Sequence, residues 1–387
     1  MKTRILLLIF ALMAILPASA KDAGQIDEQF VVGKVKDVSQ SSVNSELKKA
    51  GMVSNHQLVT VEVEEGSLKG MTTTIDNEIT DNPAYNVIVK PGQEVVLSVV
   101  TENGGKPEVN IADYHRAPAI WWLAGVFLVA FLAFGGKQGV KSLVGLAASV
   151  SLIALVLLPL SVKGYNPLLT AVLICLASTT ISMLVVAGFS RKALAAVLGT
   201  VGGVIVAGIA AHLVIQFAPL TGLSSEEAQI LRGSVLSQPA PFYSGLLAAG
   251  MLIGALGVIM DVGVSIASAV QEVAKTDSQL TAKELYRSGM NVGRDIMGTM
   301  TNTLILAYAG GALPLLLLTS QMPFTKLLNL DLVATEVAAA LSGSLGLVIT
   351  IPLTALFAAK LMANREVEKE MNAFLNADRD AQTSLKR

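Results

Sequence analysis

Cysteine and charged residues are both scarce in this chain of 387 residues. Cys175 is the single cysteine, which excludes a disulfide framework or a multi-thiolate metal site within one chain. Charged residues make up 15% of the sequence, whereas a soluble globular protein has about 25%. The formal net charge of −1 argues against nucleic-acid binding through an excess of positive charge. With 52% hydrophobic residues, the composition is that of a membrane protein.

Motifs of known enzymes are missing as well. The sequence has no H-E-x-x-H, no P-loop and no dinucleotide fingerprint. Asp261 lacks the second deep aspartate that intramembrane aspartyl proteolysis needs, and Ser265 has no histidine nearby, since His212 lies toward the opposite side of the membrane. His56 and His115 are isolated, and we expect both to be ordinary surface residues. We therefore predict no catalytic residues, no cofactor and no metal site.

The first 20 residues, MKTRILLLIFALMAILPASA, have the three parts of a secretory signal peptide. Lys2 and Arg4 form the basic part, residues 5–16 are apolar, and residues 18–20 form a small-residue cleavage site. An uncleaved membrane anchor is the alternative interpretation. Both interpretations place residue 21 outside the cytoplasm.

Residues 21–115 predict a small β domain outside the membrane. Val59, Val61 and Val63 alternate with polar residues, which is the period of a half-buried strand. Three further segments predict strands: 30–38, 86–89 and 94–100. Pro91 and Gly92 supply a turn before the last of these strands. Four or five short strands predict a small barrel or sandwich of OB-like type.

Seven apolar runs follow, and each has the roughly 20 residues needed to cross a bilayer. They lie at about 118–134, 142–162, 167–188, 193–217, 243–268, 296–318 and 334–360. Lysine and arginine gather in alternate connections, which places the N-terminal domain outside and the C-terminus in the cytoplasm. We therefore predict an α-helical polytopic protein of the bacterial plasma membrane. Its predicted parts are 1–20 (signal peptide), 21–115 (β domain), 116–362 (membrane domain) and 363–387 (cytoplasmic tail).

Polar side chains enter two neighbouring spans. The carboxylate of Asp261 lies in a run, residues 251–270, that is otherwise apolar or small, and such a residue by default marks a pathway or an ion site. Two sets of residues each share one helix face: Asp261, Ser265, Ser268 and Glu272, and then Asn291, Asp295, Thr299 and Asn302. Both Asp261 and Asn302 should lie about 10 Å from the inner ends of their helices. We expect these two polar stripes to face each other.

Two interpretations of the stripes stay open. One is an ion- or proton-linked role centred on Asp261, and the other is a hydrogen-bonded seam that fixes the register of the helices. The candidate residues for the first role are Asp261, Asp295, Asn302, Thr299, Ser265 and Ser268. Secondary candidates are Glu272, Arg294, Glu336 and His212.

Long motifs around these residues resemble the YibE/F family of bacterial membrane proteins. They are GVIMDVGVSIASAVQEV, then ELYRSGMNVGRDIMGTMTNTLILAYAG, then a last span with Glu336 and TIPLTAL. The resemblance extends over the chain after the signal peptide and implies no particular biochemical role. A fainter similarity to the membrane unit of SecD and SecF would match Asp261 to their intramembrane aspartate and residues 301–303 to a following polar stretch. This chain departs from that pattern in three ways. It has no Arg-Ile-Arg at the end of the helix that carries the aspartate, it has no large domain after its first mature span, and it has one extra span.

Two functions follow as hypotheses. The first is ion- or proton-coupled transport or energy transduction, with Asp261 titrating. The second is a non-transporting envelope assembly or scaffold protein whose β domain binds partners. The expected partners are the lipid bilayer and either a second copy of the chain or a related family membrane protein, whereas the ligand stays unidentified.

Overall fold

The computed structural model describes residues 27–41, 55–80, 86–101, 107–235, 238–277, 279–319 and 322–363. The expected signal peptide and the tail from residue 364 onward lie outside these residues. One compact unit holds a β-sheet and extends along the chain to Phe134, and a second unit of helices begins at Gly135.

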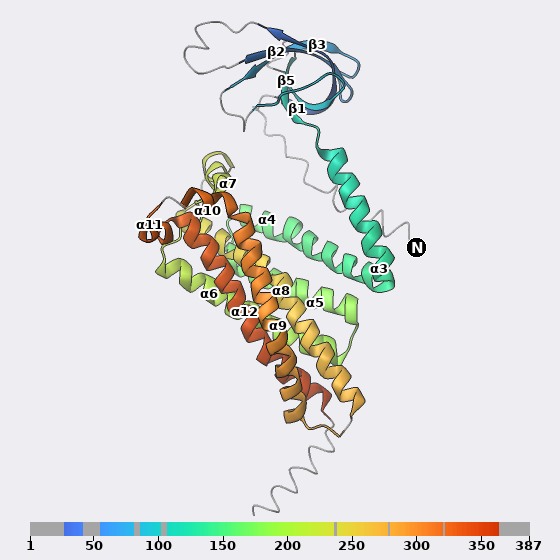
Figure 1. Ribbon diagram of the computed structural model, residues 1–387, viewed down its shortest axis with the longest axis vertical. Helices are drawn as coiled ribbons and strands as arrows, with labels where there is room; N and C mark the ends of the chain where they lie inside the picture. Colours follow the sequence, from blue (N-terminus) through green and yellow to red (C-terminus); the bar gives the residue numbers. More distant parts are fainter. Residues whose placement is uncertain are drawn as a thin grey trace, which may run out of the picture. The chain divides into compact units, whose positions relative to one another are not determined.

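Five antiparallel strands form one sheet in the order β3-β2-β1-β4-β5. They are β1 (Asp27–Ser41), β2 (Asn55–Val63), β3 (Thr72–Ile79), β4 (Glu94–Thr101) and β5 (Glu108–Tyr114). The sheet curls into a half-barrel (Figure 1), and a bulge in β1 between Val35 and Asp37 adds to the bending of that strand. Val59, Val61 and Val63 point into the core of the half-barrel, as their alternation predicts.

Two sequence expectations for this sheet differ from the structure. Residues 86–89 do not form a strand, so that prediction was wrong; their backbone is bonded to side chains instead of a neighbouring strand. Strands β3 and β5 were not expected, and they are the two edges of the sheet. Because β3 and β5 approach each other without pairing, the described strands leave the barrel open, and an OB-like fold is not confirmed.

Helices make up the rest of the described chain. The long ones are α3 (Ala117–Leu152), α5 (Pro167–Ala187), α6 (Arg191–Phe217), α8 (Ala240–Thr276), α9 (Ala282–Gly311) and α12 (Asp331–Met362). The short ones are η1 (Ile153–Leu157), α4 (Leu158–Val162), α7 (Glu226–Ile230), η2 (Leu231–Val235), α10 (Leu313–Thr319) and α11 (Phe324–Leu328).

Five helical stretches of the described residues are long and apolar enough to cross a membrane: 117–162, 167–187, 191–217, 240–276 and 331–362. The first contains two of the expected runs, joined through Gly136, whose backbone is not helical (φ 50°). The expected run at 296–318 is divided between α9 and α10, and α9 is not among the five. The polytopic helical fold is therefore present, but the number seven is not confirmed.

The helical unit is built around α6, α8 and α12, with α9 beside α12 and α8, and α5 beside α8 and α6 (Figure 1). Glycines spaced four apart allow these helices to approach closely. Gly199 and Gly203 of α6 contact α12, and Gly289 and Gly293 of α9 contact α8 and α12. Gly250 of α8 also has a glycine four residues away, but it is exposed with nothing within 4 Å among the described residues, so it takes no part in this packing.

Candidate functional site: polar sides of α8 and α9

The polar residues of α8 lie on its outer side. Asp261, Ser265 and Glu272 are exposed, and Ser268 is partly exposed. The opposite side of the helix, which includes Ile266, is buried against the neighbouring helices. This division arises because residues three, four and seven apart share one side of a helix.

The helix α9 is divided in the same way. Leu285, Gly289, Gly293 and Leu304 form its buried side. Between positions 291 and 302 its exposed side carries five polar residues, which we name the α9 polar face: Asn291, Arg294, Asp295, Thr299 and Asn302. At the start of α9, Thr281 and Glu284 form a reciprocal capping box, which fixes where the helix begins.

Contacts between α8 and α9 give the level of each polar residue. A Cβ atom on Gly293 would lie 3.3 Å from Ile266, and one on Gly289 would lie 2.8 Å from Val270. The paired positions run in opposite directions along the two helices, so α8 and α9 are antiparallel. Counting five residues along each helix from the contact between Ile266 and Gly293 places Asp261 at the same height as Gly298. Asn302 lies one turn farther, about 6 Å along α9. The two stripes thus run side by side at nearly matching depth.

Within the described residues, no hydrogen bond joins the two stripes. The Asp261 carboxylate has no hydrogen-bond or ion-pair partner there, and the hydroxyl of Thr299 donates to the carbonyl of Ile296 (2.9 Å) in its own helix. Arg294 donates weakly to Asn291 at 3.5 Å. Both stripes are exposed on the outside of the bundle, and they do not cover one another.

The remaining candidates lie apart from this surface. Glu272 pairs with Lys275 (2.7 Å) near the end of α8. His212 is exposed near the end of α6, and Glu336 is partly exposed near the start of α12. Packing of Gly208 against Leu252 and of Gly343 against Ala255 places His212 and Glu336 level with residues 248–251 of α8. They are thus ten or more residues from Asp261 along that helix, and the structure does not bring them together.

Three buried threonines, which sequence reasoning missed, lie at the centre of the bundle. Thr350 and Thr354 of α12 contact Gly203 and Gly199 of α6, and Thr200 of α6 contacts Gly263 of α8. All three threonines are fully buried (0% exposed). Among the described residues, the hydroxyls of Thr200 and Thr354 have no hydrogen-bond partner, whereas Thr350 donates to the Gly346 carbonyl at 2.8 Å. The four-residue glycine spacing in α6 permits close packing, but it does not say which residues fill the contacts.

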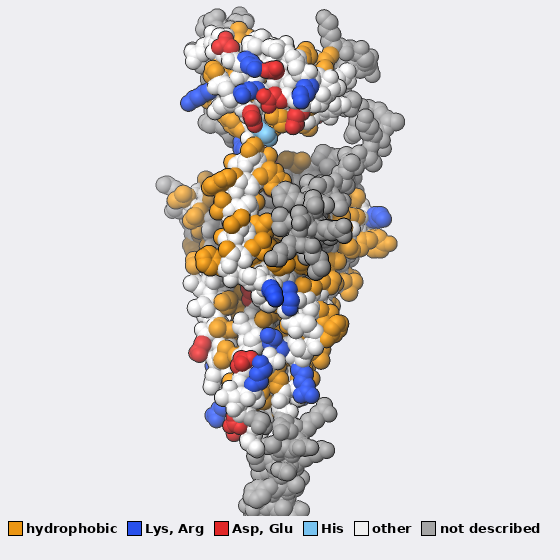
Figure 2. Space-filling model, turned by 90° about the vertical axis from the view of Figure 1, so that its right-hand side faces the viewer, with side chains coloured by type: hydrophobic (Ala, Val, Ile, Leu, Met, Phe, Trp, Pro, Cys, Tyr) orange, Lys and Arg blue, Asp and Glu red, His pale blue; other side chains and the backbone are white. Residues whose placement is uncertain are grey.

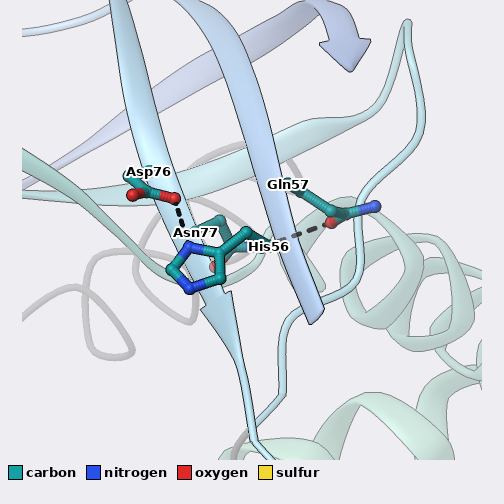
Figure 3. A network of polar contacts seen from close by, with 4 residues as sticks. All are labelled: His56, Gln57, Asp76 and Asn77. Carbon is teal, nitrogen blue, oxygen red and sulfur yellow. Dashed lines mark hydrogen bonds and ion pairs between the residues drawn. The ribbon is translucent and has the colours of Figure 1, made fainter. Parts of the chain in front are cut away.

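The β domain contains a network of polar side chains on β2 and β3 (Figure 3). His56 is 9% exposed and pairs through Nδ1 with Asp76 (2.8 Å), so it is not an ordinary surface residue. The amide of Asn77 donates to Gln57 at 3.3 Å. His115 likewise has a partner, the carboxylate of Glu94 at 2.9 Å.

This network holds the segment 86–90, which lacks regular structure. Gln57 accepts from the N–H of Val89 (3.2 Å) and donates to its carbonyl (3.4 Å), while Asn77 donates to the carbonyl of Val87 (2.8 Å). The Tyr114 hydroxyl accepts from the N–H of Ile88 (2.8 Å) and donates to its carbonyl (3.0 Å). Side chains of β2, β3 and β5 thus satisfy backbone groups that a neighbouring strand would otherwise bond.

Basic residues gather at one end of the helical unit. They come from the start of α6, the end of α8, the start of α9 and the end of α12: Arg191, Lys192, Lys275, Lys283, Arg287 and Lys360. Arg191 also donates to the carbonyl of Leu361 (3.2 Å), at the end of α12. On the flank in Figure 2, hydrophobic side chains cover much of the helical unit, and most of its visible basic side chains lie in its lower half.

Comparison with known proteins gives the family. Residues 123–364 match the model of the YibE/F-like protein family, and residues 27–114 match the model of the YibE/F family N-terminal domain. No curated protein and no solved structure matches the chain. These matches do not show the similarity to SecD and SecF. The chain belongs to the YibE/F family, and its several apolar helices are those of a membrane protein.

Proposed function

We propose that this protein is an ion- or proton-coupled transporter or energy-transducing protein, in which the Asp261 carboxylate binds and releases the proton or cation. One observation carries the proposal: Asp261 is exposed in a stretch of α8, residues 251–270, that is otherwise apolar or small, and it has no partner among the described residues. The α9 polar face lies beside it at nearly the same level.

The cost of this arrangement supports a functional role. A carboxylate in the middle of a membrane helix costs about 2.5–3.5 kcal/mol on insertion scales. Packing alone gives no reason to keep it, because the side of α8 that holds the bundle together is the opposite one. A charged group that is retained there needs water, a counter-ion or a polar partner.

Roles for the neighbouring residues follow from their positions. Ser265 and Ser268 on α8 and Thr299 and Asn302 on α9 carry groups that can hydrogen-bond water near Asp261. Arg294 and Asp295 lie about one turn nearer to the basic end of the bundle. At that position they can line the path by which the proton or cation reaches Asp261 from that end. Glu272 is nearer still to that end.

The topology is part of the proposal. We propose seven crossings of the bacterial plasma membrane, with a reversal at Gly136 and with α9 and α10 together completing one crossing. The β domain, of OB-like type, then lies outside and the C-terminus in the cytoplasm. The cluster of basic residues at one end of the bundle supports this orientation, because positively charged connections stay on the cytoplasmic side.

The test is proton flux into liposomes that contain the purified full-length protein, under an imposed pH gradient. We expect Asp261→Asn to abolish the wild-type flux, because an asparagine amide cannot bind and release a proton as a carboxylate does. Glu226→Gln, which removes an exposed carboxylate of the short helix α7, serves as the matched control and should keep wild-type flux. Equal flux in the wild type and Asp261→Asn, with both proteins folded, would overturn the role of Asp261.

A scaffold function is the second candidate, and exposed apolar side chains on the β domain favour it. Phe30 on β1 is 64% exposed and Ile88 in the segment 86–90 is 51% exposed. Exposed apolar surface can mark a site of protein interaction, and phenylalanine is enriched in the cores of protein interfaces. If the wild type carries no proton or cation flux, photo-crosslinking from position 30 in intact cells should then capture an envelope protein, and Phe30→Ser should lose both the adduct and the cellular function.

A further inference from the structure

The α9 polar face is unusual among the exposed surfaces of the described helices. The exposed sides of α5, α6 and α12 carry large apolar residues, such as Leu173 (66% exposed), Ile209 (55%) and Leu341 (54%). Those sides suit contact with lipid. On α9, by contrast, polar and charged residues recur over the three turns from Asn291 to Asn302.

Lipid cannot satisfy these groups. Within the described residues, Thr299 and Arg294 bond only within α9, and no side-chain hydrogen bond or ion pair joins the polar face to another helix. In a membrane, polar groups on a helix are covered by other helices or by water. The other described helices offer no exposed set of polar groups at this depth except Asp261 and Ser265 of α8.

The α9 polar face is complementary to itself. Arg294 and Asp295 are adjacent and of opposite charge, and both are exposed. In a pair of chains related by a twofold axis along the membrane normal, each residue meets the other copy at its own depth. Arg294 of one copy can therefore pair with Asp295 of the second, twice over, and Asn302 can bond Asn302.

We propose that a second copy of this chain packs against the α9 polar face, so that the protein is a twofold symmetric dimer in the membrane. The glycines on the buried side of α9 are already used within one chain, by contacts with α8 and α12. The polar side is therefore the one available to a partner. Each contact across a twofold interface occurs twice, so the adjacent opposite charges of Arg294 and Asp295 form two ion pairs between the copies.

The charges at this surface link the dimer to the site of the proposed function. Each copy contributes two carboxylates, Asp261 and Asp295, and one guanidinium, Arg294. Reciprocal Arg294–Asp295 pairs leave Asp261 as the surplus carboxylate beside the interface. This part of the inference rests on the proposed function, since it assigns the proton or cation to Asp261, whereas the dimer itself does not depend on it.

The test is disulfide crosslinking of the full-length protein in its native membrane. The native Cys175 is buried, so a cysteine introduced at position 302 is the one available for reaction. Under copper-phenanthroline oxidation, Asn302→Cys should give a disulfide-linked dimer, while Leu173→Cys on the exposed side of α5 should stay monomeric. Equal crosslinking of the two variants would reflect random collision and would overturn the proposal.

A second outcome would also overturn it. If Asn302→Cys stays monomeric but reacts with a membrane-impermeant maleimide, the polar face lines water in a single copy. Charge reversal tests the pairing: Arg294→Glu should reduce the crosslink at least about fivefold, and adding Asp295→Arg should restore it. Asp261→Asn should leave the crosslink unchanged while abolishing flux, so failure of the dimer and failure of the proposed function can be told apart.

Discussion

Thr350 of α12 packs directly on Gly203 of α6, where no space is left for a side chain on the glycine. A Cβ atom at position 203 would meet the Thr350 hydroxyl and would lie 2.7 Å from the carbonyl oxygen of Gly346. The same kind of contact recurs between Thr354 and Gly199. The backbones of α6 and α12 are thus held together with little between them, which is the close approach that small residues permit in membranes.

Gly203→Ala should therefore destabilise the protein. The added methyl group meets a backbone carbonyl that cannot move without separating the helices, and overpacking of this kind costs about 1–3 kcal/mol. Thermal unfolding in detergent should show a lower midpoint. The matched control is Gly257→Ala on α8, which has open space around it and should be neutral or slightly more stable. A Gly203→Ala variant as stable as the control would show that the helices can separate freely here.

Thr200→Val tests the buried hydroxyl that contacts Gly263. The Thr200 hydroxyl has no hydrogen-bond partner among the described residues, so replacing it by a methyl group of the same shape removes an unpaired polar group. We expect unchanged stability or a gain of about 1 kcal/mol in the same unfolding assay. Thr350→Val, which deletes a hydroxyl bonded to Gly346, is the comparison. A clear loss of stability in Thr200→Val would mean that the hydroxyl has a bound partner.

Gln57→Ala should loosen the segment 86–90. It removes both side-chain bonds to Val89, and a buried backbone group left unpaired costs about 1–3 kcal/mol. Hydrogen–deuterium exchange should quicken at the Val89 amide while the core of β4 stays protected. Gln57→Glu keeps an acceptor for the Val89 N–H but places a buried carboxylate oxygen against the Val89 carbonyl, so exchange should quicken in this variant as well. Unaltered exchange in both variants would contradict the role assigned to Gln57.

Acid should weaken the end of the β domain at Asp113. The Arg116 side chain (2.6 Å), followed by the N–H of Tyr114, holds the pKa of the Asp113 carboxyl below its ordinary value. A lowered pKa means that the stabilisation is fully present above the unfolded value of about 3.9 and is lost as the pH falls through the folded value.

The measurement compares the unfolding midpoints of the wild type and Asp113→Asn as the pH is lowered from 6 to below the usual aspartate range. We expect the difference between the two unfolding midpoints to be constant above about pH 5 and to narrow as the pH is lowered further. Because Asp113 is largely exposed, added salt should shrink the difference at every pH. A gap that widens as the pH falls would reverse the sign and rule out this pairing.

Local pattern predicted much of the fold. The alternation at Val59, Val61 and Val63 was sufficient for β2, because one face of a sheet is buried and the period of two follows directly. Residues 86–89 have the same strand-like composition, yet Gln57, Asn77 and Tyr114 bond their backbone. Those partners lie 10 to 32 residues away in sequence, so no pattern within the segment 86–89 predicts them.

The same limit applies to the candidate site. Helical counting placed Asp261 and Asn302 within about one turn of each other, because the rise per residue is constant. It could not say which way each stripe points, since that depends on packing between helices. Gly203 and Gly250 both occur in four-residue glycine pairs, but one is filled by Thr350 and the other faces open space.

The polar side of α9 has a consequence for how the protein enters the membrane. A helix with arginine, two asparagines and aspartate over three turns partitions poorly from the translocon into lipid when it is alone. Its buried glycines, however, fit α8 and α12, which are themselves apolar enough to cross. We expect α9 to be retained at the translocon until α12 has been synthesised and then to insert together with it. The least hydrophobic long helix is thus among the last to enter the lipid, although it is not the last to be synthesised.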